Sequence, residues 1–119
     1  MRVESGAPAD ADPDWSPEHF VLAGLGRCTL KSLAFHAERA SVAASGSAAV
    51  EGAVTRREED RRYALTELEC ALDVRLEPAP EGGALGELLD LAERDCFVGA
   101  SLRAKPRYAW RVNGEDVPR

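Results

Sequence analysis

The most informative stretch of the sequence is residues 16–30, SPEHFVLAGLGRCTL. It opens with a helix start signal, because Ser16 suits the N-cap, Pro17 the first helical position and Glu18 the first turn. Apolar and small residues then recur at helical spacing, which predicts a helix extending to about Arg39. One stripe contains Val21, Leu25, Cys28, Ser32 and Phe35, and its neighbour contains Leu22, Leu33 and Ala37.

The first half of this helix has an unusual composition. Residues 20–26 carry no charge, so we expect them to be buried on all sides. Gly24 and Gly26 lower helix propensity, and their expected use is to let another backbone approach closely. The sequence thus predicts a long and largely buried helix.

The residue pattern in the rest of the chain predicts strands and one further helix. Residues 1–15 read as an extended lead-in with at most a short strand at its start, and residues 41–47 as a loop. Residues 47–57 and 62–76 are typical of a β-hairpin, because apolar and polar side chains alternate along the second strand. The order ends with a helix over 84–95, a turn or short strand over 97–102, and a strand over 108–112 closed by Asn113-Gly114. Together these elements predict one α+β domain spanning residues 1–119.

The hairpin should end in the mixed-charge run of residues 56–62, RREEDRR. A solvated tip is the simplest interpretation, and a docking patch is the alternative.

Composition limits the partners that the chain can have. Its 119 residues include 15 Lys+Arg and 21 Asp+Glu, a formal net charge of −6, which argues against nucleic acid or an anionic membrane as the main partner. No signal peptide and no apolar run of membrane-spanning length is visible. Three cysteines are too few for a secreted disulfide scaffold, so we expect a reduced, cytoplasmic setting.

The cysteines allow two kinds of chemistry. A metal site is disfavoured, because no CxxC spacing occurs and His19 and His36 do not share a helical face with Cys28. A redox pair fits better, since Cys28 lies on the buried stripe and Cys96 ends the apolar face of the second helix. The alternative is that both thiols are small buried hydrophobic groups.

Charges near the two thiols would give them different roles. Lys31, one turn from Cys28, would favour the Cys28 thiolate. The helix C-terminus, Glu93 and Asp95 would disfavour a Cys96 thiolate. Within such a pair Cys28 is the better attacking sulfur and Cys96 the better resolving partner.

Residues 16–30 and a second segment, LLDLAERDC at 88–96, together resemble the OsmC/Ohr family of hydroperoxide-reducing proteins. Residues 16–30 are similar to its helix motif of a Pro-Glu pair, an Ala/Gly-rich apolar run and Cys-Thr. Residues 88–96, LLDLAERDC, look like its second-cysteine segment. The order of elements also matches, from about residue 16 to 112. The resemblance implies an OsmC-like fold, in which an antiparallel sheet packs with a long central helix and a shorter helix in an intertwined homodimer.

The resemblance also implies a thiol-dependent peroxidase for organic hydroperoxides. Cys28 would attack the peroxide and become a sulfenic acid, and Cys96 would resolve it to a disulfide that a dithiol reductant such as a lipoylated protein reopens. No cofactor is implied. Glu18 falls on the family's active-site glutamate, which holds an arginine against the reactive sulfur. Ten residues of helix separate Glu18 from Cys28 by roughly 15 Å, so a partner's Glu18 would serve Cys28.

The chain departs from the family pattern in three places. The family's arginine comes from an N-terminal β-hairpin, where this chain is short, and Arg2 and Arg27 are the candidates to replace it. Phe97 stands where a proline commonly follows the resolving cysteine, a change that we expect to affect backbone stiffness more than chemistry. Cys70 has no counterpart and should be a core thiol of a strand.

The missing arginine favours a rival hypothesis from another class. A non-catalytic dimer of the same fold could bind a small apolar ligand in its interface pocket, and a purely structural partner subunit is a third reading. The reactivity of Cys28 near neutral pH separates the first two, because only the peroxidase needs a low pKa.

Overall fold

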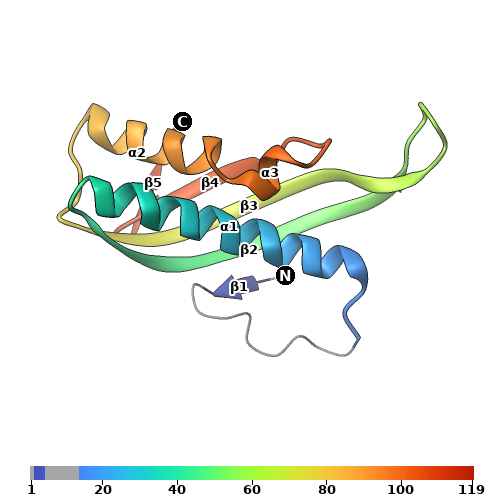
Figure 1. Cartoon of the computed structure of the whole chain (residues 1–119), viewed down its shortest axis with the longest axis horizontal. Helices are drawn as coiled ribbons and strands as arrows, with labels where there is room; N and C mark the ends of the chain where they lie inside the picture. Colours follow the sequence, from blue (N-terminus) through green and yellow to red (C-terminus); the bar gives the residue numbers. More distant parts are fainter. Residues whose placement is uncertain (1, 5–13) are drawn as a thin grey trace.

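The computed structural model describes residues 2–4 and 14–119, which form a five-stranded sheet and three helices (Figure 1). Their bounds are β1 Arg2–Glu4, α1 Pro17–Arg39, β2 Ala43–Arg56, β3 Tyr63–Glu77, α2 Gly83–Arg94, α3 Phe97–Ala100, β4 Arg107–Val112 and β5 Glu115–Val117. The α+β class is confirmed. Within the described residues no helix is long and apolar enough to cross a membrane.

The sheet has the strand order β1-β2-β3-β4-β5, and most of its pairs are antiparallel. The pair β3–β4 is parallel, because the connection through α2 and α3 returns the chain to the end of the sheet from which β3 began. Asn113 and Gly114 adopt positive φ angles of 51° and 85° and turn the chain from β4 into β5, a short strand that the sequence did not predict.

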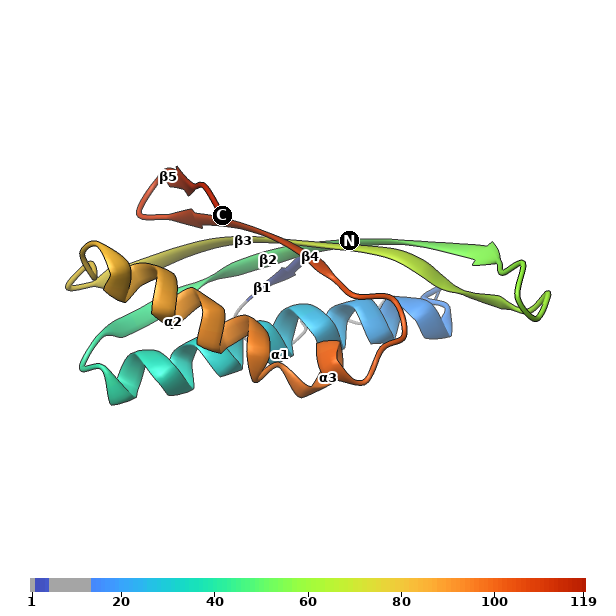
Figure 2. The same cartoon turned by 90° about the horizontal axis from the view of Figure 1, so that it is seen from above.

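All three helices lie on one face of the sheet, as Figure 2 shows. The core fills the space between the two layers. On β3 the inward positions Leu68, Cys70, Leu72, Val74 and Leu76 are at most 2% exposed, which confirms the predicted alternation. Helix α1 contributes Leu25 and Leu33 from above, and α2 contributes Leu89.

Two local predictions were wrong. Residues 43–47 belong to β2 and not to a loop, because the small residues there pair with the C-terminal end of β3, residues 73–77. A Cβ at Gly46 would collide with the carbonyl oxygen of Asp73, so the close approach of the two strands requires glycine at this position. Residues 97–100 form the single-turn helix α3, where a turn or short strand was expected.

The hairpin of β2 and β3 projects beyond the N-terminal end of α1 (Figure 2). Its tip is the charged run 56–62, which is largely exposed and is closed by an ion pair between Arg57 and Asp60. The predicted position of the run at an exposed hairpin tip is confirmed, and the docking patch stays a prediction.

Candidate active site between the long helix and the α2–α3 corner

Cys28 and Cys96 come from elements far apart in sequence. Cys28 lies in the middle of α1 and is 8% exposed, whereas Cys96 is fully buried at the N-cap of α3. The two thiols are free, and they lie close enough that Cys96 raises the pKa of Cys28. The structure therefore brings together the two cysteines that the sequence analysis paired.

Thr29 fixes the position of Cys96, a role that the sequence did not reveal. Its Oγ1 donates to the carbonyl oxygen of Leu25 at 2.9 Å and contacts Cys96 Sγ at 3.3 Å. The Cys96 thiol in turn faces the same Leu25 carbonyl at 3.9 Å. A fully buried hydroxyl thus holds the sulfur of α3 against the backbone of α1.

The environment of Cys28 acts on its thiol in two directions. Burial raises the pKa of Cys28 above its ordinary value, and the neighbouring Cys96 raises it further. The backbone N–H groups of Val98 and Phe97, at the start of α3, donate to the sulfur and lower the pKa. The net direction is upward, so in a single chain the protonated thiol is favoured.

The backbone N–H of Phe97 adds a chemical effect to one expectation. The replacement of a proline by Phe97 was expected to affect stiffness more than chemistry. Proline has no N–H, whereas the N–H of Phe97 donates to the Cys28 sulfur, so this residue type bears directly on the thiol.

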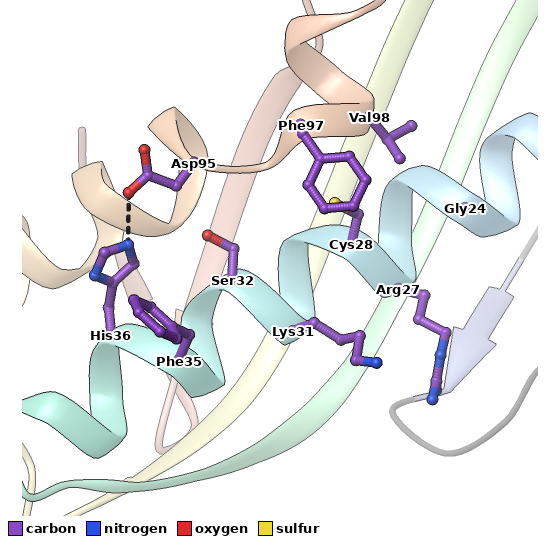
Figure 3. A pocket seen from close by; sticks show the side chains of 10 residues that line it. All are labelled: Gly24, Arg27, Cys28, Lys31, Ser32, Phe35, His36, Asp95, Phe97 and Val98. Atoms are coloured by element: carbon purple, nitrogen blue, oxygen red, sulfur yellow. Dashed lines mark hydrogen bonds and ion pairs between the residues drawn. The ribbon is translucent and has the colours of Figure 1, made fainter.

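Cys28 opens into a cavity of about 540 Å³ beside α1 (Figure 3). Its apolar walls come mainly from Phe35, Phe97 and Val98. Arg27 and Lys31 contribute the basic groups of the lining, but Figure 3 shows both side chains pointing away from the Cys28 sulfur. This arrangement suits an apolar ligand whose reacting end meets the thiol.

A hydrogen bond between His36 and Asp95 marks the far end of the cavity. His36 Nε2 lies 2.7 Å from Asp95 Oδ2, which ties α1 to the C-cap of α2 directly before Cys96. Arg94 binds the same carboxylate, and Arg94 and then His36 lower the pKa of Asp95 to about 2.

The prediction of an uncharged, fully buried segment over residues 20–26 was wrong. Phe20 is 53% exposed, and a Cβ at Gly24 would meet nothing within 4 Å. Phe35 and Phe97 are also exposed, at 57% and 74%. Beside the cavity, α1 therefore presents an apolar face that the described chain leaves open.

The third predicted site residue stays apart from the thiols. Glu18 lies in the first turn of α1 and does not line the cavity that Cys28 faces. Arg2 belongs to β1, and its side chain lies outside the described part of the structure.

Behind the two thiols lies a buried polar layer. Cys70 is fully buried on β3, and burial raises its pKa to about 12, which agrees with an unreactive core thiol. Burial also raises the pKa of Tyr108, whose hydroxyl lies near Thr29 and Cys96. No group of three metal-ligating side chains occurs in residues 14–119.

A model of the family described as OsmC-like protein matches residues 9–111. Similar solved structures include an OsmC-like protein from Vibrio cholerae, with a TM-score of 0.69 and 16% identity over 79% of this chain and 62% of that one. An OsmC-like protein from Mycoplasma pneumoniae gives 0.63 and 18% over 86% and 79%. The organic hydroperoxide resistance protein OhrB of Bacillus subtilis gives 0.58 and 18% over 82% and 70%.

The chain thus spans less than two thirds of the Vibrio cholerae protein. No curated protein sequence matches it. At these identities the solved structures establish the fold, and the family match confirms the resemblance drawn from the two motifs.

Proposed function

Because the chain belongs to the OsmC-like protein family, we propose that it is a cysteine-dependent peroxidase that reduces organic hydroperoxides. The observation that carries the proposal is the pairing of two free thiols, one of which opens into an apolar cavity. The name of the similar Bacillus subtilis protein, organic hydroperoxide resistance protein, supports the same substrate class.

The reaction needs only the two thiols and an external reductant. The sulfur of Cys28 attacks the terminal peroxide oxygen, the O–O bond breaks, and the alcohol leaves with the thiol proton while Cys28 becomes a sulfenic acid. The Cys96 sulfur then displaces the sulfenic hydroxyl as water and forms a disulfide. A dithiol, such as that of a lipoylated protein, reduces this disulfide and is itself oxidised. We expect the cycle to run in the cytoplasm, where such reductants keep thiols reduced.

We further propose that the active form is an intertwined homodimer, each subunit being one domain over residues 1–119. Two observations support it, the open apolar face of α1 and the raised pKa of Cys28 within one chain. Helix geometry adds that ten residues of α1 separate Glu18 from its own Cys28 by roughly 15 Å. A second copy would cover Phe20 and Phe35 and bring its Glu18 towards Cys28.

The chemistry is tested by treating the protein with one equivalent of cumene hydroperoxide and analysing it by mass spectrometry. We expect a Cys28–Cys96 disulfide. Cys28→Ser should abolish dithiol-dependent peroxide consumption, and Cys96→Ser should accumulate a sulfenic acid or a mixed disulfide. Cys70→Ser is the matched control and should retain turnover. Undiminished turnover in Cys28→Ser would refute the proposal.

The shared site is tested by mixing two impaired variants. A heterodimer of Cys28→Ser with Glu18→Gln contains one site with an intact Cys28 and an intact Glu18 from the other chain. Co-refolding the two variants at equal concentration should therefore restore about one quarter of wild-type sites, since half of the dimers are mixed. If Glu18 acts within its own chain, no activity returns.

One observation favours a second candidate, a non-catalytic dimer that binds a small apolar ligand. Burial raises the pKa of Cys28, and the two basic side chains of the cavity point away from its sulfur. In that case iodoacetamide should alkylate Cys28 at neutral pH no faster than an ordinary thiol, and the peroxide should leave both thiols unmodified.

A further inference from the structure

Ser32 is a buried polar residue for which the mechanism above has no use. It lies one helical turn after Cys28 on α1, is 9% exposed and lines the same cavity. Among the buried side-chain nitrogen and oxygen atoms of the described residues, only Ser32 Oγ has no hydrogen-bond partner.

The lack of a partner is unusual for a serine inside a helix. Such a hydroxyl ordinarily bonds to the carbonyl oxygen four residues earlier, as Thr29 does with Leu25. A buried hydroxyl without a partner destabilises the protein, and alanine would be the better helix former at this position. A bound ligand that supplies the missing hydrogen-bond partner of Ser32 Oγ would explain why serine stands at this position.

The position of Ser32 suits a particular ligand atom. Ser32 follows Cys28 by four residues of helix, which is about 6 Å along the axis and about 40° around it. Both side chains therefore lie on the same face of α1. Figure 3 shows the Ser32 side chain between Cys28 and His36, directed towards the α2–α3 connection. A peroxide oxygen in attack position would lie about 3–3.5 Å from the Cys28 sulfur, and the second peroxide oxygen lies on its far side.

We propose that Ser32 is a substrate-contacting residue whose hydroxyl donates a hydrogen bond to the alkoxy oxygen of the hydroperoxide. This inference rests on the proposed peroxidase function and deepens it. As the Cys28 sulfur bonds to the terminal oxygen, the electron pair of the O–O bond moves to the alkoxy oxygen, and the Ser32 hydroxyl stabilises the charge that develops there. The proton released by the Cys28 thiol ends on this oxygen to give the alcohol, and Ser32 keeps its own proton.

The test compares two reactions of the same sulfur. In single-turnover experiments, oxidation of Cys28 by cumene hydroperoxide should slow roughly 10- to 100-fold in Ser32→Ala, the effect of losing one hydrogen bond to a developing charge. Alkylation of Cys28 by iodoacetamide has no peroxide oxygen and should stay within about twofold of the wild-type rate. Ser32→Thr retains a hydroxyl and should recover most of the peroxide rate. Ser45→Ala, which removes an exposed hydroxyl of β2 outside the cavity, is the matched control.

Stability gives an independent readout. Because Ser32 Oγ has no partner, Ser32→Ala should unfold at the same urea concentration as wild type or a higher one. Equal losses in both reactions, or a destabilised Ser32→Ala, would show a structural role and overturn the inference. An unchanged peroxide rate in Ser32→Ala would also overturn it. Failure of the wild-type protein itself to react with the peroxide would instead refute the proposed function.

Discussion

Replacing Gly99 by alanine should disturb the placement of Cys96 through one contact. A Cβ at position 99 would lie 2.8 Å from Tyr108 Oη, whereas Leu25 Cδ1 and Cys96 Sγ would be at 3.5 and 3.6 Å, ordinary contact distances. Overpacking a filled interior costs about 1–3 kcal/mol, and alanine regains roughly 0.5–1 kcal/mol over glycine in a helix. We therefore expect Gly99→Ala to lower the free energy of unfolding by about 1 kcal/mol, between bounds of roughly 0 and 2.5.

Urea denaturation with two further variants isolates the contact. Gly86→Ala in α2 is the matched control, because its Cβ would meet nothing within 4 Å, and it should raise stability by about 0.5–1 kcal/mol. Tyr108→Phe removes only the obstructing hydroxyl. In a double-mutant cycle Gly99→Ala should cost less in the Tyr108→Phe background, with a coupling energy of about 1 kcal/mol.

The same variant should affect the thiol chemistry. Helix α3 carries Cys96 at its N-cap and presents the N–H groups of Phe97 and Val98 to Cys28. A shift of α3 away from Tyr108 should therefore slow disulfide formation after a single peroxide turnover, and Tyr108→Phe should reverse part of the loss. If Gly99→Ala costs the same stability in both backgrounds, the contact with Tyr108 is not the cause and the reasoning fails.

Three further predictions concern charge and assembly. The free energy of unfolding should fall as pH rises from about 9 towards 12, because the folded state keeps the Cys70 proton up to about pH 12 while an unfolded thiol loses it near 8.5. The slope for one such group is about 1.4 kcal/mol per pH unit, and urea titrations at several pH values should show a shallower fall in Cys70→Ala. The stabilisation from Asp95 should be present above about pH 4 and be lost as pH falls towards 2, and Arg94→Gln should raise the carboxyl pKa in an NMR titration. Phe20→Ser, on the open face and outside the Cys28 cavity, should shift a size-exclusion profile from dimer to monomer while leaving the circular dichroism spectrum unchanged; a dimer of undiminished affinity would contradict the proposed interface.

Much of the fold could be predicted because its elements carry local signals. The start of α1 at Pro17 follows from its capping residues, and the strict alternation on β3 follows from the burial of one face. The beginning of β2 could not be predicted from its small polar residues, because pairing with β3 overrides their weak strand preference. Helix α3 was also missed, since one turn is too short to show a helical period.

Of the residues brought together at the candidate site, the sequence predicted only the two cysteines. Cys28 and Cys96 stand in recognisable motifs, and the structure places them side by side. Thr29 and Tyr108 were missed because their roles depend on contacts across the fold, with Cys96 on a different element. The backbone N–H donors of α3 could not be predicted, because almost any residue type supplies an N–H group. The only sequence signal is that position 97 is not proline.

The donors of α3 bear on how this chain could activate its thiol. An arginine next to Cys28 would stabilise the thiolate, yet Arg27 and Lys31 point away from the sulfur. The N–H groups of Phe97 and Val98 lower the pKa of Cys28, and Phe97 contributes a donor that a proline could not. Burial outweighs them in one chain, and in the proposed homodimer a second copy would have to complete the activation. Cys96 begins the same short helix, so its movement towards Cys28 during disulfide formation would also move these donors. The attack of Cys28 on the peroxide and the formation of the disulfide would then both depend on the position of α3.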